Sequence, residues 1–145
     1  MPPALHPLIV HFPFALLTLS VLAQWAGLWR RNPGLSTFAW WTQVWGTIGL
    51  ALAVGTGLLA KSTVNIPEAA LALISTHEQL AFLSASAFAI LFFWRIPSSP
   101  GLPKGYELLF LVVFTVAVGV MLAGAWFGGE MVYRFGVGVS RTGLQ

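Results

Sequence analysis

Apolar residues dominate four stretches of the chain, and each stretch is about as long as one membrane span. The stretches cover residues 8–29, 40–60, 76–94 and 107–127. A transmembrane helix needs about 20 predominantly apolar residues. The segments between the stretches contain the Pro, Gly, Ser and Asn residues that are typical of turns. The pattern therefore predicts an all-α fold, an integral membrane four-helix bundle with short loops, built by residues 1–145 as a single membrane domain.

Local motifs refine the predicted ends of these helices. Ser75 precedes Glu78 by three residues, the spacing of a capping box, which predicts that the third helix begins just before His77. Residues 66–74 then form a short helix near the membrane surface. The pair Gly128 and Gly129 permits a sharp turn, so the tail is expected to fold back over the bundle.

The composition supports a membrane protein and excludes several kinds of site. Of the 145 residues, 57% are hydrophobic and 8% are charged, whereas a soluble domain has about 25% charged residues. The chain has no cysteine, which excludes disulfides, iron–sulfur clusters, thiolate haem ligation and covalent haem attachment. Its seven basic residues form no run, so the expected partner is the lipid bilayer rather than nucleic acid.

The distribution of basic residues predicts an orientation. Two of the predicted loops lie on one side of the membrane and hold the four basic residues Arg30, Arg31, Arg95 and Lys104. The other side holds three basic residues. Short loops rich in Lys and Arg stay in the cytoplasm. We therefore expect both termini on the outer side of the membrane.

Two histidines are predicted to lie at the same depth on parallel helices. His11 comes 18 residues before Trp29, and His77 comes 17 residues before Trp94; each tryptophan closes a span. With a rise of about 1.5 Å per residue, the two imidazoles reach similar levels near one membrane face. Two neutral imidazoles that face each other across a bundle can hold a haem iron from both sides. This spacing predicts His11 and His77 as the axial ligands of one haem b.

Other residues at the same end have weaker predicted roles. His6 lies about 140° around the helix from His11, so it is expected to support the site, with ligation as the alternative. Lys61, Arg134 and Tyr133 collect at this end, where the two cations could pair with haem propionates or simply meet lipid headgroups. Gly49 and Gly119 have no side chains and could leave room for the flat haem macrocycle. Close packing of helices is the commoner role of such glycines.

Motifs at both ends of the chain resemble those of a bacterial family of small four-span membrane proteins, a domain family of unknown function. The first motif is His6-Pro7-Leu8-Ile9-Val10-His11-Phe12-Pro13. The last is Gly128-Gly129-Glu130-Met131-Val132-Tyr133-Arg134-Phe135-Gly136-Val137-Gly138-Val139. The resemblance covers essentially the whole chain. It implies a protein of the bacterial inner membrane with a distant similarity to cytochrome b-type haem bundles. Family tails often carry a histidine where this chain has Phe135, and three histidines cannot ligate two haems from both sides.

Three functions are consistent with the sequence. The first is a b-type cytochrome that passes electrons between a quinol pool, a cytochrome or a membrane subunit and an outer acceptor, as a subunit rather than a complete enzyme. The second is a non-redox accessory or scaffold subunit of a larger membrane complex. The third is a copper or other divalent-metal site made by the three histidines with Glu130 or Met131 nearby.

Overall fold

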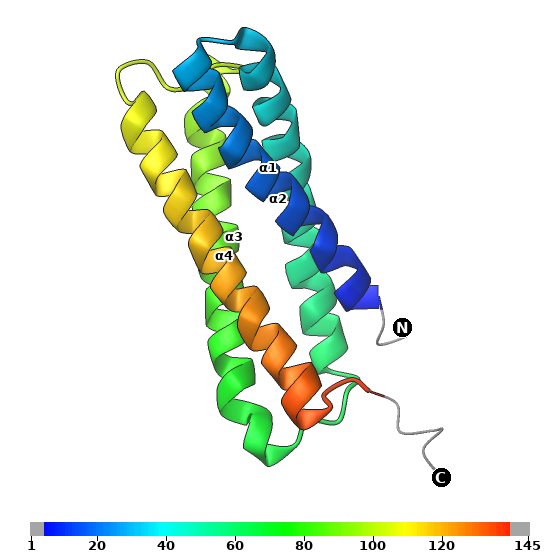
Figure 1. Ribbon diagram of the computed structural model, residues 1–145. Coiled ribbons are helices and arrows are strands. Elements are labelled where there is room, and N and C mark those ends of the chain that lie inside the picture. Colours follow the sequence, from blue (N-terminus) through cyan, green and yellow to red (C-terminus); the bar gives the residue numbers. More distant parts are fainter. Residues whose placement is uncertain (1–4, 140–145) are drawn as a thin grey trace.

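The computed structural model describes residues 5–139, which form four long helices arranged as a bundle (Figure 1). They are α1 (Leu5–Arg30), α2 (Pro33–Lys61), α3 (Leu71–Arg95) and α4 (Glu107–Phe135). Short 3₁₀ helices η1 (Glu68–Ala70) and η2 (Ile96–Ser98) flank α3. The described part contains no strand. The predicted all-α, four-helix fold is confirmed.

The bundle consists of two helical hairpins. α1 packs mainly against α2, and α3 packs mainly against α4. The hairpins meet through α2 with α3 and through α1 with α4, while the described parts of α1 and α3 make no close backbone approach. The two histidine-bearing helices are therefore diagonal neighbours. Both ends of the described chain lie at the end of the bundle that holds the histidines (Figure 1), here called the histidine end; the other is the arginine end.

The surface of the bundle is apolar over most of its length. All four helices are long and apolar enough to cross a membrane. Large apolar side chains such as Ile90 and Trp126 are 67% and 70% exposed, which would be unfavourable in water. In a bilayer these side chains contact lipid tails, so exposure costs them nothing. The helices are therefore embedded in lipid.

Local chemistry fixes two helix ends. At the start of α2, the side-chain oxygen of Asn32 accepts hydrogen bonds from the backbone N–H groups of Gly34 and Leu35, and Pro33 occupies the first helical position. At the end of α4, Gly136 adopts a left-handed conformation (φ 65°) and its N–H bonds to the carbonyl of Val132.

Two predicted boundaries are wrong. α3 begins at Leu71, directly after η1, and Ser75 lies inside the helix rather than at its N-cap. The run of Ala and Leu residues before Ser75 has high helix propensity, and this outweighs the capping box. α4 continues through Gly128 and Gly129 to Phe135, because two glycines cost a helix only about 1 kcal/mol each and the next turn packs into the bundle.

The most buried charge in the described chain is Arg95, which was expected in an exposed loop. Its side chain is 0% exposed at the arginine end. Its Nη1 donates to Oε1 of Gln43 (2.8 Å) and its Nη2 donates to Oε1 of Gln24 (2.7 Å). Further bonds reach three backbone carbonyls, those of Gly101 (2.9 Å), Pro100 (2.8 Å) and Ser36 (3.2 Å). One side chain thus joins α1, α2, α3 and the loop that leads to α4.

Every acceptor of the guanidinium is a neutral oxygen. Gln24 and Gln43 are themselves 1% and 0% exposed, so their amide oxygens have no access to water. A buried charge is tolerated only when its hydrogen bonds are made. The Arg95 cluster, defined as Arg95, Gln24 and Gln43, therefore holds the two hairpins in a fixed relation at the arginine end.

We predict that Arg95→Ala lowers the free energy of unfolding by about 3 kcal/mol or more, because it removes the hydrogen-bond donor from two buried amide oxygens and from the loop carbonyls of Pro100 and Gly101. Arg30→Ala removes an exposed cation near the same end and serves as the control, with a change of about 0.5 kcal/mol or less. Denaturant titration in detergent micelles measures both. Equal losses for the two variants would contradict the assigned role of Arg95.

Candidate functional site at the histidine end

His6 lies on the face of α1 that packs against α2. It continues a stripe of buried positions spaced by seven residues, namely Pro13, Ser20 and Gly27. Its Nδ1 lies 3.3 Å from the Thr56 hydroxyl, and a Cβ atom on Gly57 would approach Cε1 of the ring to 3.0 Å. The imidazole therefore fits against α2 because residue 57 has no side chain.

The contact with Thr56 fixes the tautomer of His6. The Thr56 hydroxyl directs its hydrogen to the backbone carbonyls of Leu52 (3.0 Å) and Ala53 (3.1 Å). It can then only accept from the imidazole, so Nδ1 of His6 carries the hydrogen and donates it to Thr56. The lone pair of the ring lies on Nε2, which is the atom available to a metal.

His77 is held in the same manner within the other hairpin. Its Nδ1 donates to the backbone carbonyl of Gly124 on α4 (2.8 Å), since a carbonyl can only accept. A Cβ atom on Gly128 would lie 3.2 Å from Cε1 of the ring. Both rings thus use Nδ1–H for a bond within their own hairpin and rest on a glycine of the neighbouring helix.

His6 and His77 lie within electrostatic range of each other across the bundle. Positive charge on one ring would repel positive charge on the other. Their levels also match: His6 rests on Gly57, and Lys61, one turn further along α2, forms an ion pair with Glu78 beside His77 (2.8 Å). Within residues 5–139, neither Nε2 atom has a hydrogen-bond partner. The site therefore offers two imidazole lone pairs from diagonal helices.

His11 lies on a different face of α1. Its side chain is exposed, and its Nδ1 donates to the backbone carbonyl of Pro7 in its own helix. It is thus His6, not His11, that lies within electrostatic range of His77 in the structure. Matching His11 and His77 by depth missed this, because depth says nothing about which face a side chain occupies. The seven-residue spacing of His6 with Pro13 and Ser20 is the signal that could have shown it.

Of the other predicted site residues at this end, the two cations have carboxylate partners. Lys61 pairs with Glu78, and Arg134 approaches Glu130 to 3.9 Å one turn away. Tyr133 is 93% exposed. All three lie at the histidine end, as expected.

The two predicted glycines do not contact a histidine. A Cβ atom on Gly49 would meet the ring of Phe12 at 3.0 Å, and one on Gly119 would meet nothing within 4 Å. Gly49 therefore serves the packing of α1 on α2. The imidazoles instead pack on Gly57 and Gly128, and the carbonyl of Gly124 bonds to His77.

Within residues 5–139, the structure assembles no metal site with three or more protein ligands. In the described part of the chain, no three side chains among His, Cys, Asp and Glu are grouped closely enough to hold an ion. Copper and zinc sites commonly use three or four such ligands. A group that needs only two axial imidazoles, such as a haem, remains compatible with the arrangement.

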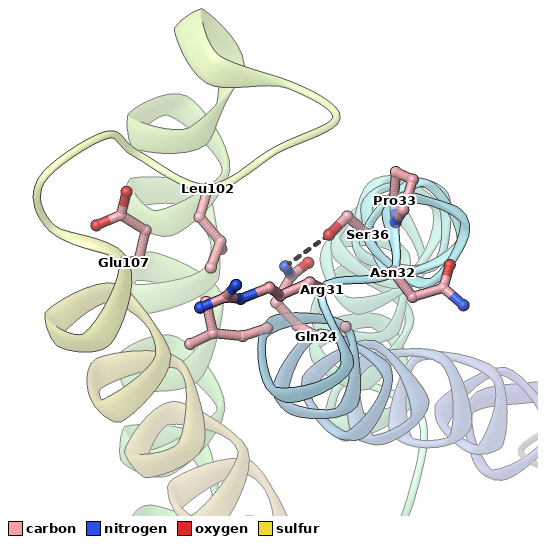
Figure 2. Close-up of a pocket in the computed structure, with 9 residues that line it drawn as sticks. Gln24, Arg31, Asn32, Pro33, Ser36, Leu102 and Glu107 are labelled. Carbon is pink, nitrogen blue, oxygen red and sulfur yellow. Dashed lines mark hydrogen bonds between the residues drawn. The ribbon is translucent and has the colours of Figure 1, made fainter.

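A concave region lies at the arginine end (Figure 2). This pocket has a volume of about 320 Å³ and lies between the α1–α2 turn and the start of α4. The bond from Nε2 of Gln24 to the Ser36 hydroxyl (3.3 Å) forms part of its wall, with Arg31 and Glu107 among the other lining residues. Because Gln24 also bonds to Arg95, the polar groups of this wall belong to the cluster that joins the helices.

Comparison with known proteins gives a family but no characterised relative. No curated protein and no solved structure matches the chain. Residues 2–141 match the family described as "Predicted membrane protein (DUF2231)", which agrees with the four apolar helices. The match covers nearly the whole chain, so the chain belongs to this family of membrane proteins.

Proposed function

We propose that this protein is a b-type cytochrome of the bacterial inner membrane, an electron-transfer subunit that holds one haem b between His6 and His77. The observation that carries the proposal is the pair of imidazoles on diagonal helices. Each ring donates Nδ1–H within its own hairpin and leaves Nε2 without a partner among the described residues. His6 here takes the ligand role that the sequence suggested for His11.

The donor set fits a haem in three respects. Axial ligation needs neutral imidazoles with an available nitrogen, and both tautomers place the lone pair on Nε2. Ligating histidines usually donate their other N–H to a carbonyl or hydroxyl oxygen, which fixes the ring and raises its basicity. Gly57 and Gly128 also keep side chains away from the rings on the sides where they pack.

A bound haem would supply one-electron transfer at this position. The chain's own groups would set its properties. Thr56 and the carbonyl of Gly124 orient the two ligands. The apolar helices limit the access of water, which affects the potential. Lys61 and Arg134 supply positive charge at the same end for the propionates, shared with Glu78 and Glu130.

The charge distribution supports an orientation with the histidine end outside. Arg30, Arg31 and Lys104 are exposed at the arginine end, whereas Lys61 and Arg134 at the histidine end are each paired with a carboxylate. Exposed basic residues in short loops favour the cytoplasmic side. The haem would then exchange electrons with partners at the outer face, either a quinol in the outer leaflet or a protein.

We predict that the detergent-purified protein shows a b-type reduced-minus-oxidised visible spectrum that His6→Ala and His77→Ala each abolish. Loss of either imidazole would leave the haem with one axial ligand, so the haem would no longer link the two hairpins. His11→Ala is the matched control, because it removes an exposed imidazole from the same helix, and it should keep the spectrum.

Two results would contradict the assignment. A colourless wild-type protein from haem-replete cells would exclude the cytochrome and favour the accessory-subunit alternative. A spectrum lost in His11→Ala but kept in His6→Ala would restore His11 as the ligand.

We also predict that Thr56→Val weakens haem retention by about 10-fold and raises the midpoint potential. The variant removes the acceptor for Nδ1–H of His6, so the imidazole becomes a weaker donor to the ferric iron. Thr63→Val is the control, since this hydroxyl bonds only to backbone carbonyls of α2. Redox titration and haem transfer to apomyoglobin measure the two effects. Identical behaviour of the two variants would show that Thr56 does not orient a ligand.

A further inference from the structure

The pocket at the arginine end is separate from the proposed haem site and is lined by both hairpins. Gln24, Arg31 and Ser36 line it from the first hairpin. Leu102 and Glu107 line it from the loop before α4 and from the start of α4. Its volume of about 320 Å³ is within the range of small-molecule sites. A group that fills this pocket would therefore contact both hairpins at once.

The pocket lies at the depth of the lipid headgroups. Arg31 directly follows α1, and Glu107 is the first residue of α4. Because α4 has 29 residues, it is about 44 Å long against about 30 Å of hydrocarbon, so its ends lie outside the hydrocarbon. Two aromatic residues next to these charges, Trp29 and Tyr106, are 89% and 59% exposed, as is typical of side chains at the membrane–water interface. The ligand best placed to enter the pocket is therefore a lipid headgroup.

Hydrogen-bond donors line the first-hairpin side of the pocket. Gln24 is 1% exposed, and only one bond of its Nε2, to the Ser36 hydroxyl (3.3 Å), is made within residues 5–139, which leaves its second N–H free. Figure 2 shows the guanidinium of Arg31 directed from the turn toward the side formed by Leu102 and Glu107. This side of the pocket therefore suits an anion with several acceptor oxygens.

Arg95 adds positive charge directly behind the same wall. Its Nη2 donates to Oε1 of Gln24 (2.7 Å) and to the backbone carbonyl of Ser36 (3.2 Å), and both residues line the pocket. The guanidinium is 0% exposed, and no carboxylate of the described chain pairs with it. A buried charge is screened much less than an exposed one. The buried cation therefore strengthens the attraction of the wall for an anion.

Glu107 supplies the opposite charge from the second hairpin. Although Arg31 and Glu107 line one pocket, neither forms an ion pair with any residue that the structure describes. The pocket thus has a cation and donors on one side and a separate carboxylate on the other. This arrangement is complementary to a zwitterion whose phosphate and ammonium groups are a few atoms apart.

We propose that this pocket binds the headgroup of phosphatidylethanolamine, with the phosphate at Arg31 and Gln24 and the primary ammonium at Glu107. Phosphate oxygens accept charge-assisted hydrogen bonds from a guanidinium, and an ammonium donates them to a carboxylate. Phosphatidylglycerol has no cation to place beside Glu107, and the quaternary ammonium of phosphatidylcholine has no N–H to donate. The site goes beyond the proposed function and does not depend on the haem.

The backbone of Arg31 offers a variant that separates binding from folding. Arg31 has a φ of 51°, in the left-handed region that is unfavourable for a residue with a Cβ atom. Glycine commonly occupies this position after a helix. Arg31→Gly is therefore expected to keep the turn or to stabilise it, while it removes the cation from the pocket.

The test uses the full-length protein, washed free of lipid in dodecyl maltoside. Native mass spectrometry measures the binding of dioleoyl-phosphatidylethanolamine and of the phosphatidylcholine and phosphatidylglycerol with the same chains. O-phosphoethanolamine is titrated separately as the headgroup without chains. The variants are Arg31→Gly and Glu107→Gln, and Arg30→Gln is the matched control because it removes an exposed cation that does not line the pocket. Denaturant titration gives the unfolding midpoint of each variant.

We expect the wild type to bind phosphatidylethanolamine about 10-fold more tightly than the other two lipids, the usual effect of one charge-assisted hydrogen bond. Glu107→Gln should weaken this lipid about 10-fold, to the affinity of phosphatidylcholine. Arg31→Gly should weaken all three lipids about 10-fold without lowering the unfolding midpoint. Arg30→Gln should match the wild type.

Three results would overturn the inference. Equal binding of the three lipids to the wild type would exclude an ammonium site at Glu107. Unchanged affinity in Arg31→Gly would exclude the phosphate site. Binding of O-phosphoethanolamine as tight as that of the lipid would assign the pocket to a soluble phosphate compound rather than to the membrane. None of these readouts depends on whether the protein holds haem, so failure here leaves the cytochrome proposal unaffected.

Discussion

The buried guanidinium of Arg95 determines how the two hairpins are joined. It has no access to water, and five neutral oxygens accept its hydrogen bonds. Any separation of the hairpins at this end would therefore expose the charge or leave it buried without hydrogen bonds. The apolar core, which includes Leu17, Phe88, Phe110 and Phe114, extends from this cluster through the middle of the bundle. The arginine end is thus a fixed junction from which both hairpins reach across the membrane.

The histidine end is built differently. Each imidazole is fixed by the other helix of its own hairpin: His6 by Thr56 and Gly57 of α2, and His77 by Gly124 and Gly128 of α4. Between the hairpins, the ion pair of Lys61 with Glu78 is a surface contact of small energetic value. A group that binds both Nε2 atoms would therefore be the main link between the hairpins at this end, and the rigid junction at the other end would hold the two rings at a constant separation.

Much of the fold can be predicted from the sequence, because the thickness of the bilayer sets the length of each apolar stretch. The face on which a polar residue lies was harder to predict. Arg95 looked like a loop charge because it ends an apolar stretch, yet its partners Gln24 and Gln43 are 71 and 52 residues away and become visible only once the helices pack. The sequence favours His11 over His6 for the same reason, since matching the depth of two residues does not match their rotation around the helix. The resemblance to a family of small membrane proteins is confirmed, whereas the similarity to haem bundles that it implies stays a prediction.

The most direct test of the central claim is electron paramagnetic resonance of the ferric protein prepared with ¹⁵N-histidine. The account predicts a low-spin signal with hyperfine coupling to two imidazole nitrogens, which His11→Ala leaves unchanged. A high-spin signal, coupling to a single imidazole, or no haem signal at all would contradict ligation by a pair of histidines from the two hairpins.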